Sequence, residues 1–198
     1  MHYVRTDGKG TMVAWMVTEQ QKANSGLPDR FFEALPPTPR PEHNPLSHSV
    51  SPRPPVRVDG AFVQQWDVIP LPLDKAKSRA FEALATLRWE REVGGIEVGG
   101  LPVRTDRETQ ASISRARQSF IEGDLQSVRW KLGDGQMITL GAVEIAGIAS
   151  AVTAHVASCF DAEGAVIDAL TAATDIPTLI AIDLTTEFDA AYAASMSV

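Results

Sequence analysis

The sequence contains only one cysteine, Cys159, and four histidines among its 198 residues. A single cysteine excludes an intrachain disulfide framework and any zinc site that is built from several thiolates. It also agrees with assembly in a reducing compartment, where disulfides are rare. The fold must therefore depend on a hydrophobic core, and a chain of this length can bury one.

Basic residues are in the minority, with 18 Lys and Arg against 25 Asp and Glu and a net charge of −7. Because a nucleic-acid backbone requires a basic surface, we expect no nucleic-acid partner. No apolar run approaches the roughly 20 residues that span a bilayer, and the polar start "MHYVRTDGKG" is unlike a signal peptide. The composition predicts a soluble, acidic globular protein without membrane insertion.

The first third of the chain divides into three segments. Residues 1–35 form a small N-terminal segment, with a buried strand expected at Thr11–Val17 and a short helix within Leu27–Leu35. Residues 36–55 hold eight of the 13 prolines, which predicts an extended linker or arm outside helix and sheet; a docking ligand is the alternative. Residues 56–73 predict a β-hairpin lead-in that turns at Asp59-Gly60.

The remaining chain predicts a domain over residues 74–185 and a tail over 186–198 that frays unless it docks on a partner. We expect a helix from an N-cap at Asp74 to Gly94-Gly95, a hairpin, and a second helix that ends near Gly123. Thr105 and Glu108 have the spacing of a capping box for this second helix. A hairpin within Ser127–Leu140 precedes the longest helical pattern, in which Gly164 predicts a bend or break. The fold class is α+β: small β-hairpins packed with one short and one long α-helix, after a proline-rich extended arm and a small β-containing segment.

Four glycines in "GGIEVGGLPV" (residues 94–103) raise the question of a phosphate-binding loop. Such loops have the spacing GxxxxGK[ST], or GxGxxG between a strand and a helix. Neither spacing is present, and Gly99-Gly100 instead separates two short strands, Ile96–Val98 and Leu101–Val103. We therefore interpret these glycines as hairpin-turn residues and expect no nucleotide cofactor.

No catalytic, cofactor or metal residue is predicted. His155 and Cys159 lie four residues apart on one helical face, but further metal ligands are missing, and we expect Cys159 to pack in the core. His155 could donate to a buried carbonyl. A catalytic nucleophile–base pair of Cys159 and His155 is not expected, because no oxyanion-hole sequence accompanies these residues.

Two acidic pairs, Glu90/Glu92 and Asp183/Glu187, are expected to be solvated. The arginines at positions 88, 91, 104, 107, 115 and 117 predict ion pairs between helices, or contact with an acidic partner.

Three blocks follow in order the pattern of a known family: "LATLRWEREVGGIEVGGLPVRTDRETQASISRA", "VRWKLGDGQMITL" and "IAGIASAVTAHVASCFDAEGAVIDAL". Over about residues 76–182 the chain resembles an uncharacterised domain family of tailed-bacteriophage and prophage tail proteins. Members occur in tail-fibre, tail-tip and fibre-assembly genes. The resemblance implies a location rather than a mechanism, and it implies no catalytic residues.

The resulting hypothesis is a structural component of a phage tail (tail tip, baseplate or tail fibre), assembled in the bacterial host cytoplasm and acting without catalysis. Its partners would be other tail proteins and copies of itself. A trimer is expected because the neighbouring elements are too few to cover the apolar face of the long helix well, and because fibre proteins usually have this symmetry. The alternative is a tail-fibre assembly chaperone that is absent from the mature virion. A hydrolase would need paired carboxylates or a triad in a cleft, and the sequence concentrates neither.

Overall fold

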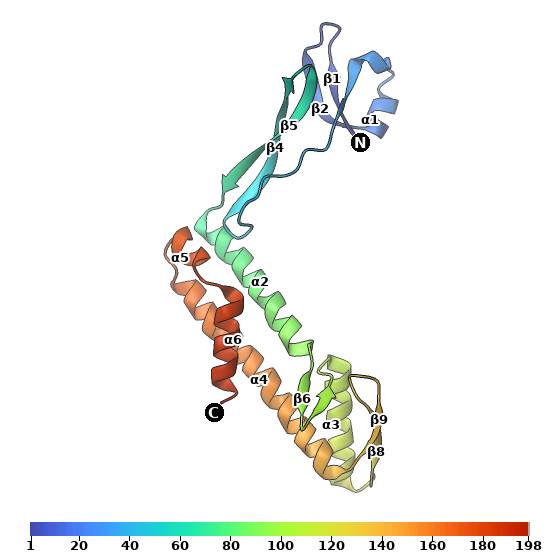
Figure 1. Ribbon diagram of the computed structural model, residues 1–198, viewed down its shortest axis with the longest axis vertical. Coiled ribbons are helices and arrows are strands. Elements are labelled where there is room, and N and C mark those ends of the chain that lie inside the picture. Colours follow the sequence, from blue (N-terminus) through green and yellow to red (C-terminus); the bar gives the residue numbers. More distant parts are fainter. Residues whose placement is uncertain (198) are drawn as a thin grey trace. The chain divides into compact units, whose positions relative to one another are not determined.

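The structure is a computed structural model that describes residues 1–197, and it divides into two compact units, Met1–Pro72 and Leu73–Val198. Helices make up 48% of the chain and strands 26%, in small antiparallel sheets, so the predicted α+β class is confirmed (Figure 1). The boundary between the units lies within a residue or two of the predicted boundary between the hairpin and the helical domain.

Unit 1 is a small β-rich body. Its elements are β1 (His2–Thr6), β2 (Met12–Thr18), α1 (Glu19–Asn24), the 3-10 helix η1 (Asp29–Phe31), β3 (Phe32–Leu35), β4 (His48–Val58) and β5 (Ala61–Pro70). The first three strands form an antiparallel sheet in the order β2-β1-β3. Val4, Leu35 and Phe62 form its core, with Met12 and Trp15 packed against them.

Two expectations for this segment are wrong. The stretch predicted as a short helix contains only one 3-10 turn and then β3, because Phe32–Leu35 pairs with β1. The strand predicted as buried, β2, lies at an edge of the sheet, where Val13 is 55% exposed. In both places pairing across the sheet overrides the local pattern.

The second half of the proline-rich segment is also not a free linker, because residues 48–55 belong to β4. This strand pairs with β5 across Val58–Ala61, and the turn at Asp59-Gly60 has positive φ at both positions, 48° and 84°, as predicted. Prolines are tolerated because a two-stranded ribbon consists of edge strands, whose outward N–H groups need no partner strand. The register shifts between Arg53 and Val56, where two of the prolines lie.

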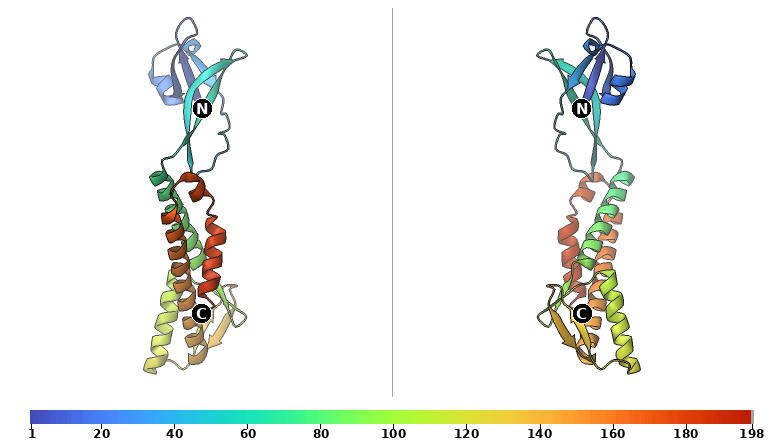
Figure 2. Two further views of the ribbon diagram at one scale, coloured as in Figure 1. Left: turned by 90° about the vertical axis from the view of Figure 1, so that its left-hand side faces the viewer. Right: turned by 90° about the vertical axis from the view of Figure 1, so that its right-hand side faces the viewer.

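Unit 2 contains the longer helices. Its elements are α2 (Leu73–Val93), β6 (Ile96–Val98), β7 (Leu101–Val103), α3 (Arg107–Glu122), β8 (Val128–Lys131), β9 (Met137–Leu140), α4 (Ala142–Ala172), α5 (Ile176–Ile180) and α6 (Leu184–Ser195). The helices α2, α3 and α6 all pack against α4, which is the centre of the unit (Figure 2). Two hairpins, β6–β7 and β8–β9, lie at the end of the unit that holds α3.

The apolar face of α4 is covered by its own chain. Ile145, Ile148 and Val152 pack with Val103, Ile113 and Leu140, and Val166 and Leu170 are buried further along. The face on which the trimer was predicted is therefore occupied by α2, α3 and α6. The inward face of α4 therefore no longer supports self-association, and the oligomeric state stays a prediction.

α4 runs without interruption through Gly164, so the expected break is absent. Its length and its mean hydropathy of 1.5 meet the criteria for a membrane span, contrary to the expectation that no segment would. The core helix of a globular domain passes the same test. Packing of three helices against α4, and burial of its inward face, agree with that role.

The predicted fraying tail is mostly helical. Most of residues 186–198 belongs to α6, whose Phe188 is fully buried. The partner on which this tail docks is α4 of the same chain. Ser195 reinforces the contact by donating to Asp161 over 2.9 Å.

Candidate functional site

The glycine-rich stretch forms a tight hairpin. Val98 pairs with Leu101, and Gly99 and Gly100 between them have φ values of 58° and 79°. Two successive positive φ values define the primed hairpin turn that glycine favours. The turn interpretation of these glycines is confirmed, and the hairpin follows directly from the end of α2.

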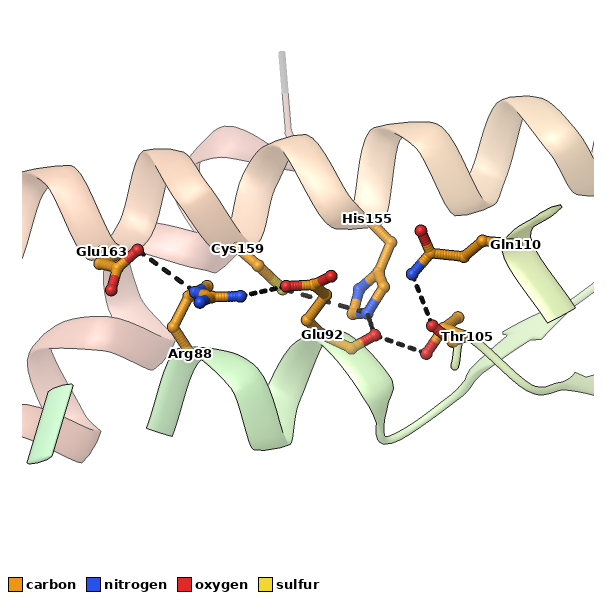
Figure 3. A network of polar contacts seen from close by, with 7 residues as sticks. All are labelled: Arg88, Glu92, Thr105, Gln110, His155, Cys159 and Glu163. Carbon is orange, nitrogen blue, oxygen red and sulfur yellow. Dashed lines mark hydrogen bonds and ion pairs between the residues drawn. The ribbon is translucent and has the colours of Figure 1, made fainter. Parts of the chain in front are cut away.

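Most polar interactions of interest gather where α2 ends beside the middle of α4 (Figure 3). The main-chain oxygen of Glu92 accepts a hydrogen bond from the Thr105 hydroxyl over 2.6 Å and lies 3.2 Å from Nε2 of His155. The Thr105 hydroxyl also accepts from the N–H of Gly95 over 2.9 Å. The last carbonyls of a helix have no partner within it, so side chains from two other elements satisfy this one.

Thr105 was predicted as the N-cap of α3, and that prediction is wrong. The cap is Asp106, whose carboxylate accepts from the N–H and the hydroxyl of Thr109. These hydrogen bonds, led by the one from the N–H, hold the pKa of Asp106 below its usual range. Thr105 is fully buried, and its main-chain oxygen accepts from Gln110 over 2.6 Å. Two neighbouring residues thus have different roles: Asp106 caps α3, and Thr105 is a buried side chain that binds the end of α2.

His155 is held by both ring nitrogens. A carbonyl oxygen can only accept, so Nε2 carries a hydrogen and donates to Glu92. In the neutral ring Nδ1 is then an acceptor, and the hydroxyl of Tyr192 in α6 donates to it over 2.8 Å. The two rings meet edge to face at 5.6 Å. His155 therefore joins α2, α4 and α6, and its contact with a buried carbonyl agrees with the sequence expectation.

A buried ion-pair group continues the network along α2. Arg88 pairs with Glu92, and its Nε lies 3.3 Å from Glu163 of α4 without pointing its N–H at that carboxylate. Glu92 is only 4% exposed, so the expectation that it is solvated like Glu90 is wrong. The guanidinium of Arg88 also lies over the ring of Phe160, 4.7 Å from its centre.

The other charged residues singled out in the sequence lie elsewhere. Arg91 pairs with Asp189 of α6 over 2.9 Å, and Arg104 pairs with Asp106 over 3.0 Å. Ion pairing between helices, the preferred interpretation of the arginine cluster, is thus present at positions 88 and 91. Asp183 caps α6 and accepts from two backbone N–H groups of its first turn. Asp183 and Glu187 are both exposed, as expected from the sequence.

Cys159 is completely buried, and its Sγ lies 4.0 Å from Nε2 of His155. Burial, together with the nearby carboxylate of Glu92, raises the pKa of the thiol to about 11. The thiol is therefore protonated at neutral pH and screened from solvent, which is the opposite of an activated nucleophile. Within residues 1–197 no group of three or more His, Cys, Asp or Glu side chains is placed to hold a metal ion.

A surface depression of about 400 Å³ lies beside the network, and its lining includes His155, Phe188 and Tyr192. Both nitrogens of His155 are already engaged, and Arg91 at the rim is paired with Asp189. His155, Tyr192 and Arg91 are thus already engaged with other parts of the chain. The polar network fixes α2, α4, α6 and the start of α3 against each other.

Comparison with known proteins gives one match. The family model described as "Domain of unknown function (DUF4376)" matches residues 75–192, which is more than half of the chain. The chain belongs to this family. No curated protein and no solved structure matches.

Every residue of the network lies within the segment matched by the DUF4376 model. Sequence reasoning singled out His155, Cys159 and Arg88 but missed Tyr192 and the roles of Glu92 and Thr105. The position of Glu92 in the last turn of a helix was an available signal, because carbonyls there require outside donors. Nothing local indicated that Tyr192, 37 residues beyond His155, would supply its hydroxyl.

Proposed function

We propose that this DUF4376 protein is a structural component of a bacteriophage tail, in the tail tip, baseplate or fibre, and that it acts through assembly and without catalysis. Two observations support this function. The sequence resembles a phage tail family over residues 76–182. The residues that carry the resemblance form internal architecture.

The polar network is the observation that supports an architectural role best. Arg88, Thr105, Gln110 and His155 all lie in the blocks that carry the resemblance, and their polar atoms bind other parts of the same chain. In an enzyme at least one such group would be expected to face a cleft with an unsatisfied or shifted reactive atom. The reactive candidate, the thiol of Cys159, is instead buried and protonated.

The proposed partners are other tail proteins and copies of the chain, and the site of assembly is the host cytoplasm before incorporation into the virion tail. A trimer stays the prediction from fibre symmetry, now without support from the buried face of α4. Unit 1 offers a second type of surface, a long β-ribbon with both edges unpaired by other described strands. Such edges are suited to contacts between chains.

Quantitative mass spectrometry of gradient-purified infectious particles tests the proposal. A tail component is expected at a fixed copy number relative to the major tail protein. A fibre-assembly chaperone would be abundant in infected cells but absent from particles, so that outcome would replace the proposal with its alternative. Cell-wall or capsule degradation by the purified chain, abolished by a point substitution, would contradict both.

A further inference from the structure

A groove lies between α3 and the first half of α4. It has a volume of about 590 Å³. Ile113, Val152 and Val156 give the groove an apolar floor, and Ala149 and Ala157 line it on the α4 side. Apolar hollows of this size are typical of binding sites. Unit 2 therefore contains a second candidate site, separate from the depression beside the polar network.

The groove has the dimensions that one more helix would fill. Along α3 its lining runs from Gln110 to Ile121, which at 1.5 Å per residue is about 16 Å, or roughly three helical turns. Two packed helices leave a groove of this kind between them, and the side chains of a third helix fit into it. Ile121 is 67% exposed, so a large apolar side chain at the edge of the groove is available to a partner.

The α3 side of the groove carries two arginines without a partner. Arg117 lines the groove, and Arg107 lies on the same helical face, because it precedes Gln110 by three residues and Ser114 by seven. Both arginines are exposed, and neither forms an ion pair within residues 1–197. Two cations about 15 Å apart along the helix therefore lie beside an apolar floor.

No carboxylate in the groove neutralises these two cations. The described lining contains no Asp or Glu, and α4 has no Asp, Glu, Lys or Arg between Glu144 and Asp161. The chain as a whole has a net charge of −7, so the groove locally reverses the charge of the protein. Unpaired cations beside an apolar surface favour a partner that is both apolar and acidic.

We propose that the groove binds an amphipathic α-helix of another protein, whose apolar side covers Ile113, Val152 and Val156. Two acidic residues of that helix, about eleven positions apart, then pair with Arg107 and Arg117, because this spacing places both on one side of the helix at about the required distance. The inference rests on the proposed function for one point, that the partner is another tail protein.

The chain's own helices do not supply this partner. The buried apolar residues of α2, α3 and α6 belong to helices that pack against α4, and α1 and α5 have six and five residues. A long helix from a second copy would have to leave its own core to enter the groove, and it would lose the burial it has there. A helix whose apolar side is uncovered in its own protein has no such loss.

Fluorescence anisotropy of synthetic helices, titrated with the full chain, tests the groove. The first probe is a hydrocarbon-stapled peptide of about 18 residues, with leucines along one side and, beside them, two glutamates about eleven positions apart. The second probe has lysines in place of the glutamates. We expect the glutamate peptide to bind with a dissociation constant below about 100 µM, and the lysine peptide to bind about tenfold more weakly.

A charge reversal separates ion pairing from a change in folding. The double variant Arg107→Glu/Arg117→Glu is expected to bind the lysine peptide more tightly than the glutamate peptide, a result that damage to the fold does not produce. Arg115→Glu/Arg129→Glu is the matched control, because it changes the net charge equally at exposed positions that do not line the groove. This control is expected to keep the preference for the glutamate peptide.

A larger side chain in the wall tests the apolar part of the contact. Ala157→Gln places added bulk in the groove and is expected to weaken the binding of both peptides about fivefold. Ala154→Gln is the control, since Ala154 is also exposed on α4 but does not line the groove. Equal ellipticity at 222 nm in all variants ensures that lost binding is not a lost fold.

Equal affinity for the two peptides overturns the proposal, as does a failure to bind a glutamate peptide that circular dichroism shows to be helical. A double arginine variant that keeps the preference for glutamate, or full binding by Ala157→Gln, contradicts it as well. An oligomer of the chain alone that Ala157→Gln dissociates in light scattering makes a second copy the occupant, and this outcome also overturns the proposal.

The proposed function can fail separately from this inference. Peptide binding by a protein that is absent from particles contradicts only the tail assignment. A protein that is found in particles but binds neither peptide contradicts only the assignment of the groove.

Discussion

Nε2 of His155 lies 3.2 Å from the main-chain oxygen of Glu92, so a side chain in the middle of α4 completes the last turn of α2. The two residues are 63 positions apart in the sequence. Their contact ties the end of one helix to the centre of another, at the point where the chain turns into the β6–β7 hairpin. A helix end that depends on a distant residue makes the packing of unit 2 cooperative.

Replacing His155 by alanine is expected to destabilise unit 2 by about 2–4 kcal/mol, because it opens a cavity and removes a donor from a buried carbonyl. Tyr192→Phe removes one hydrogen bond without a cavity and is expected to cost about 1 kcal/mol. His43→Ala, at an exposed position in unit 1, is the control. Urea unfolding followed at 222 nm measures all three, since most helical residues lie in unit 2. Equal midpoints for His155→Ala and His43→Ala would contradict the assigned role.

Thr105→Val keeps the shape of the side chain but deletes the hydroxyl that links Glu92 to Gly95, so we expect a loss of about 1–3 kcal/mol. Thr105→Ser keeps the hydroxyl and is expected to retain most of the stability. Asp106→Ala removes the true cap of α3 and is expected to cost about 1 kcal/mol. Glu108→Ala should have little effect. A large loss of stability in Glu108→Ala would instead support the capping box of Thr105 and Glu108 that the sequence predicts.

Arg88 and Arg91 provide a comparison between a buried and a surface ion pair. Arg88→Leu leaves Glu92 buried without its cation, and breaking such a pair is expected to cost about 3–5 kcal/mol. The pair of Arg91 with Asp189 is about half exposed on both sides, so Arg91→Leu is expected to cost about 1 kcal/mol or less. Thermal unfolding at low and high salt measures both, and only the Arg91 effect should shrink in high salt.

The local elements of unit 2 could be predicted because their signals are local. Gly99-Gly100 dictates a two-residue turn, Gly123 ends α3, and the apolar period of α4 selects one inward face. The inward face was visible in the sequence, but the elements that cover it were not. α6 was interpreted as a fraying tail, since an alanine-rich segment shows its docking only through a few residues such as Phe188.

The polar network could not be predicted for a related reason. Glu92 and Glu90 look alike in sequence, and the fold buries one and exposes the other. Thr105 precedes Asp106, either can cap a helix, and the choice is made by the distant carbonyl that takes the Thr105 hydroxyl. The prolines of β4 led to a different error, because a strand was predicted as an extended linker. The rule against proline in sheets applies to interior strands and not to a two-stranded ribbon.

The thiol of Cys159 is expected to resist modification while the protein is folded. It has no exposed surface, and burial keeps it protonated, so the reactive thiolate is scarce. In Ellman's reagent at pH 8 we expect less than one-tenth of the rate seen in urea, with one thiol titrated per chain after unfolding. Fast reaction of the folded protein would indicate an accessible thiol and reopen the catalytic interpretation of Cys159 and His155.

The same burial predicts how stability depends on alkaline pH. The pKa of Cys159 is raised from an ordinary value of 9.0 to about 11 in the folded protein, mainly by burial and further by Glu92. Below pH 9 the thiol is protonated in both states, and its contribution to stability is complete. Between pH 9 and 11 the unfolded chain releases the proton while the folded chain keeps it, so stability falls by on the order of 1 kcal/mol per pH unit.

Burial also raises the pKa of Tyr192, so the ionisation of this phenol lowers the stability of the folded protein further at higher pH. Cys159→Ala separates the two contributions, because it removes the thiol and leaves the phenol. Urea unfolding at intervals from pH 8 to 11 is therefore expected to give a shallower decline for Cys159→Ala than for the unchanged protein, whatever their difference at pH 8. Parallel declines would mean that the thiol ionises alike in both states, and that Cys159 is less enclosed by α2 and α4 than its position indicates.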